Sequence, residues 1–296
     1  AYHIMFSAIN KAWRDFEGSH VVFCFEGRSW RKDHYTPYKA NRKVARDALT
    51  PREQEEDQAF FAAFDELKDF IERRTNCTTL QHKQCEADDF IARFIQNHPN
   101  DKHVIISSDS DFYQLLTDKV TQYNGISNQH MTVDGVYNDR GKAVIDKKTK
   151  EHKMLGDPEW LLFEKCVRGD TSDNVFSAYP GCRKKGTKNK VGMLEAFADK
   201  NEKGFNWNNF MLQKWVDHEG VEHRVLDDYQ RNREIIDLTA QPDNIKTVLD
   251  ETIVTQVQRV PNTGVGVHFM KFCGKHDLQR ISATAEAHAE YLNAAY

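Results

Sequence analysis

No stretch of the sequence approaches the roughly 18 consecutive apolar residues that a membrane-spanning helix requires, and the chain opens without the pattern of a secretory leader. These absences argue against an integral membrane protein and against a secreted one. Hydrophobic residues make up 39% and charged residues 29% of the 296 residues, which is typical of a globular protein with a core. We therefore expect a cytoplasmic protein, in the host cytoplasm if it is phage-encoded, without a membrane partner.

Regular cysteine spacing and an excess of positive charge are also missing. The six cysteines form no C-x-x-C pair, which argues against a zinc cluster and against a disulfide framework. Lys and Arg number 41 and Asp and Glu 45, so the net charge is −4. Overall charge does not indicate a nucleic-acid partner, and only the placement of the charges along the chain can do so.

The first 150 residues alternate strand-like apolar stretches with helical patterns. The expected strands are HVVFCF at 20–25, CTTLQ at 77–81, HVIISS at 103–108 and VTQYN at 120–124. The expected helices are residues 1–13, 51–74 and a helix that begins near residue 86. This alternation predicts the α/β class, with a mostly parallel central sheet and helices on both faces.

The helix expected from residue 51 has the clearest signals. Thr50 as N-cap, Pro51 at the first helical position and Glu53 form a capping box. Its apolar face is expected to consist of Phe60, Phe61, Phe64, Leu67, Phe70 and Ile71.

A soft domain boundary is expected near residue 150. The segment before it, 129–155, has the pattern of one or two hairpins, with Asp134-Gly135 as a turn. From Asp157 onward the chain is expected to be mostly helical. We therefore expect domains at 1–150 and 151–296.

Carboxylates gather at places where a strand or a helix is expected to begin or end. They are Glu26, Glu86, Asp88, Asp89, Asp109, Asp111, Asp170 and Asp173. Bringing such groups together creates repulsion that cations must neutralise, and oxygen ligands without His or Cys favour Mg²⁺ or Mn²⁺ over zinc. Two such ions about 4 Å apart can promote phosphodiester hydrolysis.

Each acidic cluster also has a purely structural interpretation. An acidic first turn, as at residues 86–89, suits the helix dipole, and Asp109-Ser110-Asp111 can form a turn or a cap. Asp170 and Asp173 can cap a loop, and the basic run from 28 to 43 can be a solvated surface. The metal hypothesis is favoured because acidic clusters occur together with two basic segments in a chain that is acidic overall.

The motifs EADDFIARFI, VIISSDSDFYQLL, VRGDTSDNV and PGCRKKGTKNKVGMLEAF, in this order after VVFCFEGRSWRKDHYTPYKANR, resemble the 5′-nuclease family. That family includes flap endonucleases, the 5′→3′ exonuclease domain of bacterial DNA polymerase I and the stand-alone 5′ nucleases of tailed bacteriophages. The resemblance covers residues 1 to about 200 and is greatest to the phage enzymes. It implies a two-metal phosphodiesterase that cuts near 5′ ends of DNA or RNA.

The resemblance also implies roles for the carboxylates. Glu86, Asp88 and Asp89 would hold the first Mg²⁺ (or Mn²⁺), with Asp109 shared or nearby. The second ion would be held by Asp111, Asp170 and Asp173. Glu26 stands where the family usually has Asp, so its role is less defined.

Two basic segments would hold the substrate. A helical arch at about 28–58 would admit the 5′ single strand, with Lys39 and Arg42 clamping the scissile phosphate. Tyr35 or Tyr38 would stack on an unpaired base, the alternative being packing against the base of the arch. The other expected DNA contacts are Arg31, Lys32 and Lys43 in the arch, and Arg183, Lys184, Lys185, Lys188 and Lys190 in the second segment.

The second segment, within 170–200, occupies the position of the family's helix-hairpin-helix motif. Its loop is longer than the family pattern and its second glycine is displaced to Gly186, which puts the family's monovalent cation site in question. The expected substrate is branched or nicked duplex DNA with a 5′ single strand, or an RNA–DNA hybrid. Replication proteins such as a single-strand binding protein are candidate partners, and a monomer is expected.

The sequence departs from the family at its front. The family's first strand ends in an Asp-Gly whose Asp ligates metal, and this sequence matches the family pattern only after that motif. Three interpretations therefore remain. The leading one is a Mg²⁺-dependent 5′ nuclease, and the second is a catalytically impaired DNA-junction binding protein. In the third, Asp109 and Asp111 form a phosphoaspartyl phosphatase motif, which leaves both basic segments unexplained.

Overall fold

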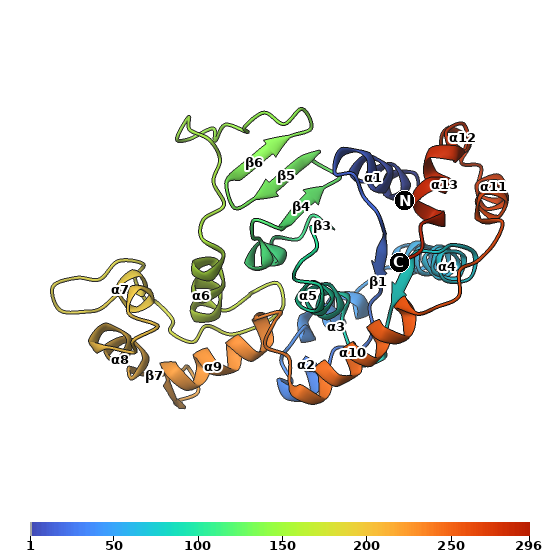
Figure 1. Ribbon diagram of the computed structural model, residues 1–296. Coiled ribbons are helices and arrows are strands. Elements are labelled where there is room, and N and C mark those ends of the chain that lie inside the picture. The colour runs from blue at the N-terminus through green and yellow to red at the C-terminus, as the bar shows by residue number, and fades with distance from the viewer. Residues whose placement is uncertain (1) are drawn as a thin grey trace. The chain divides into compact units, whose positions relative to one another are not determined.

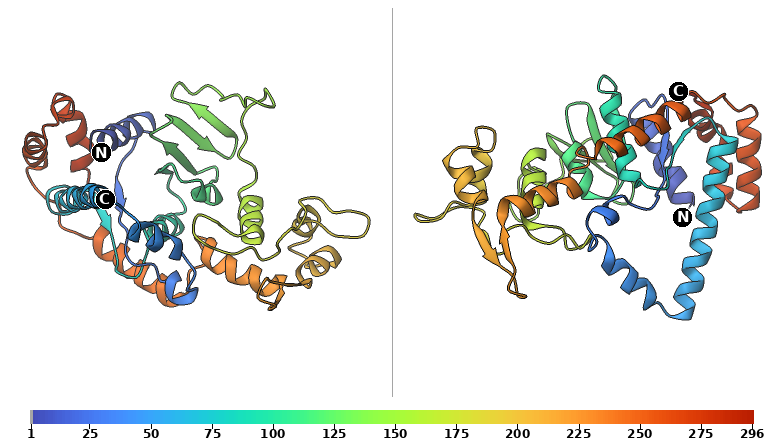
Figure 2. Two further views of the ribbon diagram at one scale, coloured as in Figure 1. Left: turned by 180° about the vertical axis from the view of Figure 1, so that it is seen from behind. Right: turned by 90° about the horizontal axis from the view of Figure 1, so that it is seen from below.

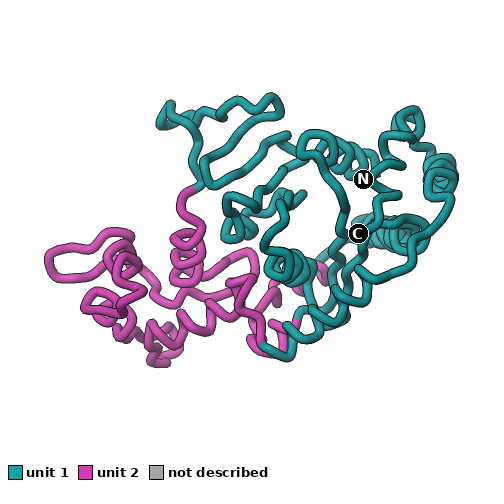
Figure 3. Tube along the Cα trace, viewed as in Figure 1, with its two compact units in different colours: residues 1–29, 48–155, 243–296 teal, residues 30–47, 156–242 magenta. Residues whose placement is uncertain are grey.

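The computed structural model describes residues 2–296 and divides them into two compact units (Figure 3). Unit 1 contains the residues up to 29, residues 48–155 and residues 243–296, and unit 2 contains residues 30–47 and 156–242. The units therefore cross the expected boundary near residue 150, because the C-terminal helices return to unit 1. The division into two domains at that boundary stays a prediction. Ala1, the first residue of the expected N-terminal helix, lies outside the described residues.

Unit 1 contains the strands and helices that the first half of the sequence predicts (Figure 1). Its strands are β1 (Val22–Cys24), β2 (Thr78–Leu80), β3 (His103–Ile106), β4 (Val120–Asn124), β5 (Gln129–Thr132) and β6 (Gly135–Asn138). Its helices are α1 (Tyr2–Asp15), α4 (Pro51–Arg74), α5 (Ala87–Asn97), the 3₁₀ helix η1 (Ser110–Leu115), α10 (Asp243–Val257), α11 (Val265–Lys275), α12 (Gln279–Ser282) and α13 (Ala285–Asn293).

The strands of unit 1 form a mixed arrangement rather than one mostly parallel sheet. β1 pairs in parallel with β2, and β3 pairs in parallel with β4, as the α/β pattern predicts. β4, β5 and β6 are antiparallel, because a two-residue connection such as that between β5 and β6 can join only antiparallel strands. Helices α4 and α10 contact β2, α5 contacts β1, and α1 contacts β3. The expected class is confirmed, whereas the single central sheet is not what the described residues form.

Helix α4 begins where the sequence predicts but buries only its C-terminal part. The Thr50 hydroxyl accepts a hydrogen bond from the Glu53 N–H at 3.4 Å, and the Glu53 carboxylate accepts one from the Thr50 N–H at 2.8 Å. Phe70 and Ile71 pack in a core with residues of α1 and α11, whereas Phe60 is 55% exposed. The first part of α4 extends away from the rest of unit 1 (Figure 2, right).

Unit 2 is mainly helical, with one short hairpin that the sequence pattern does not predict. Its helices are α2 (Arg31–His34), α3 (Ala40–Asp47), α6 (Pro158–Arg168), α7 (Met193–Ala198), α8 (Phe205–Met211) and α9 (Val225–Ile236). The hairpin consists of β7 (Lys214–Val216) and β8 (Glu222–Arg224). Phe163 and Val167 of α6 share a core with Tyr229 and Ile235 of α9, so this pair of helices supports the loop that comes after α6.

Among residues 2–296, no helix combines the length and the apolar character that crossing a membrane requires.

Candidate functional site

Glu26 comes soon after β1 and is held beside the start of α5. Its backbone carbonyl accepts a hydrogen bond from the Gln81 side chain at 2.8 Å, and its carboxylate accepts one from the Ala87 N–H at 3.4 Å. The next residue must be Gly27, because a Cβ there would lie 2.0 Å from the backbone oxygen of His82. The close approach of these two segments places the Glu26 carboxylate at the N-terminus of α5, where the helix dipole favours negative charge.

Glu86 and Asp89 form a capping box at the start of α5. The Asp89 carboxylate accepts a hydrogen bond from the Glu86 N–H at 3.0 Å, and the Glu86 carboxylate accepts one from the Ser29 hydroxyl at 2.8 Å. Glu86 is 5% exposed and Asp89 is fully buried. This is the capping arrangement that an acidic first turn favours, so one oxygen of Asp89 already accepts a hydrogen bond that caps the helix.

Asp88, which lies between them in sequence, is near β1. Burial and the neighbouring Asp88 carboxylate together raise the pKa of the Cys24 thiol. The end of β1 and the start of α5 thus place Glu26, Glu86, Asp88 and Asp89 in one region of unit 1.

Asp109 and Asp111 come just after β3, as the sequence predicts. The Asp109 carboxylate caps η1 by accepting a hydrogen bond from the Asp111 N–H at 2.9 Å. From β4, the buried Gln122 side chain donates to the backbone carbonyls of Ser107 and Asp109, both at 2.8 Å. The parallel pairing of β3 with β4 therefore fixes the loop that presents both carboxylates.

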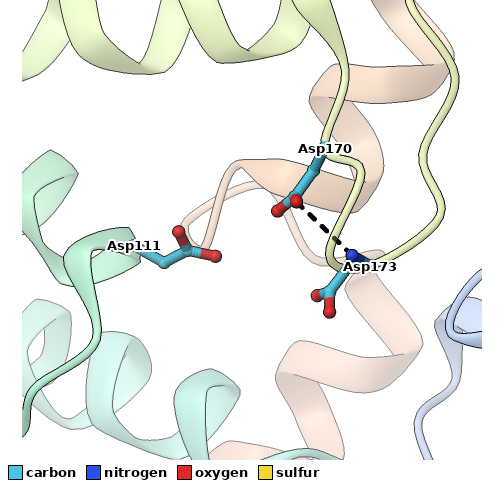
Figure 4. A group of neighbouring side chains, drawn as sticks. All are labelled: Asp111, Asp170 and Asp173. Carbon is cyan, nitrogen blue, oxygen red and sulfur yellow. Dashed lines mark hydrogen bonds between the residues drawn. The ribbon is translucent and has the colours of Figure 1, made fainter. Parts of the chain in front are cut away.

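Asp170 lies in a tight loop after α6 in unit 2. Gly169 enters this loop at φ +76°, and a Cβ there would lie 2.3 Å from the backbone oxygen of Val175. The Asp170 carboxylate accepts a hydrogen bond from the Ser172 hydroxyl at 2.6 Å. It also accepts one from the Asp173 N–H at 3.4 Å, which Figure 4 shows as a dashed line. Its other oxygen forms an ion pair with Lys165 at 2.7 Å.

These contacts set the charge state of Asp170. Burial alone would raise the pKa of its carboxyl group, but hydrogen bonds from Lys165 and Ser172 outweigh burial and lower that pKa below its ordinary value. Asp170 is therefore ionised near neutral pH. Figure 4 draws it with Asp111 and Asp173, and each of these three carboxylates can offer an oxygen to a metal ion.

Asp173 is in contact with the basic segment of unit 2. Its carboxylate lies 2.6 Å from the Arg42 guanidinium and 3.6 Å from Lys39 Nζ, and it accepts a hydrogen bond from the Tyr38 hydroxyl at 3.2 Å. The backbone carbonyl of Asp173 also accepts from the Lys39 N–H at 2.8 Å. The two cations expected to clamp a phosphate and one expected metal ligand are thus neighbours, although 131 residues separate Arg42 from Asp173 in sequence.

The other arch residues differ in how much surface they offer. Tyr38 is 5% exposed and belongs to the core of unit 2, so the packing alternative describes it. Tyr35 packs against Phe176 and lies under the Arg231 guanidinium. Arg31 is 1% exposed and donates to the backbone carbonyl of Ile235 at 2.7 Å. By contrast, Lys32 and Lys43 are exposed.

The second basic segment forms a long loop before α7. Thr187 and Lys190 pair in a small turn, and Glu195 of α7 accepts hydrogen bonds from the Gly186 N–H at 2.9 Å and the Gly192 N–H at 3.0 Å. Hydrogen bonds from backbone N–H groups, first that of Glu195 itself and then those of Gly186 and Gly192, hold the pKa of the Glu195 carboxyl below its ordinary value. The basic side chains of this loop are all exposed: Arg183, Lys184, Lys185, Lys188 and Lys190.

Several supporting residues were not predicted from the sequence. Ser29, Gln122, Lys165 and Glu195 each hold a predicted site segment in place. Glu195 could have been found, because it stands three residues after Gly192 at the start of an expected helix, which is capping-box spacing. The others contact residues that are 5 to 57 positions away, and no periodic pattern marks such pairs.

Sequence comparisons with known proteins find a matching family model for the N-terminal part of the chain. Residues 1–141 match the family model described as the 5′-3′ exonuclease N-terminal resolvase-like domain. The chain is 30% identical over 159 residues to the flap endonuclease of Escherichia phage T5, which covers 52% of this chain and 49% of that protein. It is 28% identical over 181 residues to DNA polymerase I of Rhizobium leguminosarum, which covers 60% of this chain and 15% of the polymerase.

A solved structure shows the same fold over most of the chain. The T5 5′-exonuclease, in a structure with divalent zinc ions bound, superposes with a TM-score of 0.59 at 20% identity and covers 86% of this chain and 91% of that one. The mixed α/β fold is therefore similar to that of the T5 exonuclease. The match to the curated T5 flap endonuclease spans about half of that protein's length. Residues 1–141 are similar to the 5′-3′ exonuclease N-terminal domain, and this similarity confirms the resemblance to 5′ nucleases that the sequence motifs indicate.

Proposed function

We propose that this chain is a metal-dependent 5′ nuclease that hydrolyses phosphodiester bonds at 5′ ends or flaps of DNA, and in RNA primers, during replication or repair. The observation that supports it most is the contact of Lys39 and Arg42 with the Asp170–Asn174 loop of unit 2. Two cations able to bind a phosphate lie against a carboxylate able to bind a metal ion. The proposal places the activity in the cytoplasm, where replicating DNA is found, and in a monomer.

The carboxylates fit two Mg²⁺ or Mn²⁺ ions. Every proposed ligand is a carboxylate, and oxygen ligands without His or Cys favour these hard cations. The first ion would be held by Glu86, Asp88, Asp89 and Asp109, with Glu26 close by, and the second by Asp111, Asp170 and Asp173. When bound, two such ions activate water and neutralise the charge that develops on the phosphate.

The chain's own contribution would be to hold the substrate. Lys39 and Arg42 would clamp the scissile phosphate, and electrostatic stabilisation of this kind acts most strongly when the donors are held in place beforehand. The Lys39 backbone is held by the Asp173 carbonyl, which supports such pre-positioning. Because the Arg42 side chain is 58% exposed, it can turn from Asp173 toward a phosphate.

Duplex contacts would come from the exposed basic side chains. Lys32 and Lys43 would meet the strand near the arch, and the loop 183–190 would hold the duplex phosphates in the manner of a helix-hairpin-helix, with or without a monovalent cation. Such contacts make affinity salt-dependent. The proposed substrate is branched or nicked duplex DNA with a 5′ single strand, an RNA–DNA hybrid being the second substrate. A single-strand binding protein is the proposed replication partner.

The decisive experiment is cleavage of a 5′-labelled flap duplex with Mg²⁺ and with EDTA, while binding is followed separately in Ca²⁺. Asp111→Asn should bind the flap but cut it at least about 100-fold more slowly, because a metal ligand is lost and the rate follows the charge stabilisation that metal provides. The control is Asp118→Asn, an exposed aspartate with no proposed role. Cutting by Asp111→Asn at the wild-type rate would contradict the proposed site. Tight binding by the wild type without any cutting would instead support the junction-binding alternative.

A further inference from the structure

A basic hairpin comes after β6 in unit 1, and none of the proposed roles uses it. We call residues 140–153 the basic arm. Val144 N–H donates to the Val136 carbonyl at 2.8 Å, Val136 N–H donates to the Lys153 carbonyl at 2.9 Å, and Lys153 N–H donates to the Val144 carbonyl at 2.7 Å. The arm therefore extends the β5–β6 edge, and Figure 1 shows the chain after β6 folding back beside that strand.

The tip of the basic arm is a fixed turn. The Asp146 carboxylate accepts hydrogen bonds from the Lys148 N–H at 2.8 Å and the Thr149 N–H at 2.9 Å. Lys150 adopts φ +61°, and its N–H donates to the Asp146 carbonyl at 3.0 Å. The backbone hydrogen bonds from Thr149 and Lys148 lower the pKa of the Asp146 carboxyl. Asp146 is the one acidic residue among 146–150, and its carboxylate is thus engaged by the hydrogen bonds of the turn.

Positive charge is concentrated on this arm. Residues 139–155 contain six Lys or Arg and three Asp or Glu, whereas the whole chain has 41 and 45. All six cationic side chains are exposed, and none of them forms an ion pair with any residue of 2–296. They are Arg140, Lys142, Lys147, Lys148, Lys150 and Lys153.

The chemistry of the arm fits a polyanion with regularly spaced charges. Lysine ammonium groups on flexible stems bind phosphates as point charges. Residues 139–155 contain no Phe, Tyr or Trp, so the arm has no aromatic ring on which an unpaired base could stack, as single-strand binding surfaces do. This composition favours the sugar-phosphate backbone of a duplex over a single strand.

We propose that the basic arm binds the phosphate backbone of duplex DNA, as a third contact in addition to the arch segment and the loop 183–190. The identity of the polyanion rests on the proposed nuclease function. The fixed turn at Asp146 presents Lys147, Lys148 and Lys150 together, so these three lysines are the core of the contact.

The test measures how duplex affinity depends on salt. A fluorescent blunt duplex is titrated in Ca²⁺ between 50 and 200 mM salt (roughly the range in which such contacts are resolved), with the wild type and with Lys147, Lys148 and Lys150 all changed to Gln. Each lost phosphate contact makes the slope of log K against log salt less negative by about 0.9, so we expect the slope of the Gln variant to be shallower by about 2 to 3. At about 0.1 M salt the affinity should fall more than tenfold.

Two matched variants show whether the position or merely the charge matters. Changing the same three lysines to Arg keeps the charge and should keep the wild-type slope. Changing Lys102, Lys246 and Lys271 of unit 1 to Gln removes the same number of charges elsewhere and should change the slope by less than about 1. Circular dichroism checks that all variants are folded.

The proposal is overturned if the Gln variant of the arm keeps the wild-type slope, or if the Lys102, Lys246 and Lys271 variant loses as much. It is also overturned if the arm variant loses affinity for a single strand but not for a duplex, or binds anionic vesicles less well and DNA equally well. Failure of the nuclease function looks different. The wild type would then leave the flap uncut in Mg²⁺ while duplex binding still depended on the arm.

Discussion

At the scale of single residues, the main finding is that Asp173 has cationic neighbours. Arg42 and Lys39 neutralise this carboxylate from the same unit, and the Tyr38 hydroxyl donates to it. A carboxylate held in this way can exchange one cation for another, so a metal ion and Arg42 would compete for it. Arg42 would then be available to a phosphate once a metal ion neutralised Asp173.

Arg42→Ala should therefore slow flap cleavage by about 10- to 100-fold, because the loss of one preorganised donor at a reacting phosphate has costs of that order. Single-turnover cleavage in Mg²⁺ measures the effect, and Arg42→Lys should recover part of it. Arg46→Ala is the control, since Arg46 is exposed on the same helix and has no proposed contact. Equal rates for Arg42→Ala and Arg46→Ala would remove Arg42 from the proposed clamp.

At the scale of elements, α4 combines two different surfaces in one helix. Its C-terminal part packs in the core of unit 1, where the ring centroids of Phe70 and Phe272 are 4.4 Å apart. Its N-terminal part is exposed, and the rings of Phe60 and Phe64 stack on its surface. The sequence pattern predicts one continuous apolar face, and the packing uses only the C-terminal part of it.

Phe70→Ala should lower the free energy of unfolding by about 3 to 5 kcal/mol, the usual cost of truncating a buried phenylalanine. Phe60→Ala on the same helix should change it by less than about 0.5 kcal/mol, as expected for an exposed position. Urea unfolding followed by circular dichroism gives both values. Similar losses in the two variants would mean that the exposed part of α4 is covered in solution.

At the scale of the whole molecule, contacts between distant parts of the sequence hold unit 1 together. Arg93 of α5 forms a bidentate ion pair with Asp250 of α10, with N–O distances of 2.7 and 2.6 Å. Asn97 donates to the same carboxylate at 2.8 Å. These hydrogen bonds hold the pKa of the Asp250 carboxyl below its ordinary value, and the largest contribution comes from Arg93.

Asp250→Asn should lower the free energy of unfolding at pH 7 by about 0.5 to 1 kcal/mol, because the pair is partly exposed and screened by solvent. The folded-state pKa of Asp250 is lowered, so its stabilisation is fully present above the ordinary value of about 4 and is lost as pH falls through the folded-state value. Denaturant unfolding from about pH 7 to about pH 3 should show the two proteins converging at low pH. A difference that widened as the pH fell would contradict this linkage. Asp243→Asn, at the exposed start of α10, is the control.

The sequence alone was enough to predict features that depend on local physics. The capping box at Thr50, the strands of β1 to β4 and the carboxylates that come after β1 and β3 were predicted correctly, because caps and apolar periodicity are properties of a few consecutive residues. The motifs, taken together, also indicated the similarity of residues 1–141 to the 5′-3′ exonuclease N-terminal domain.

Features that depend on distant contacts could be seen only once the chain was folded. The return of the C-terminal helices to unit 1, the burial of Arg31 against α9, and the pairing of Arg42 with Asp173 join residues that are far apart in sequence. The physical reason is that burial and ion pairing are set by whichever surfaces meet, and no local pattern specifies the partner. The number of lysines and arginines in the basic arm can be read from the sequence. Their position on a fixed hairpin, however, depends on the backbone hydrogen bonds between Val136, Val144 and Lys153.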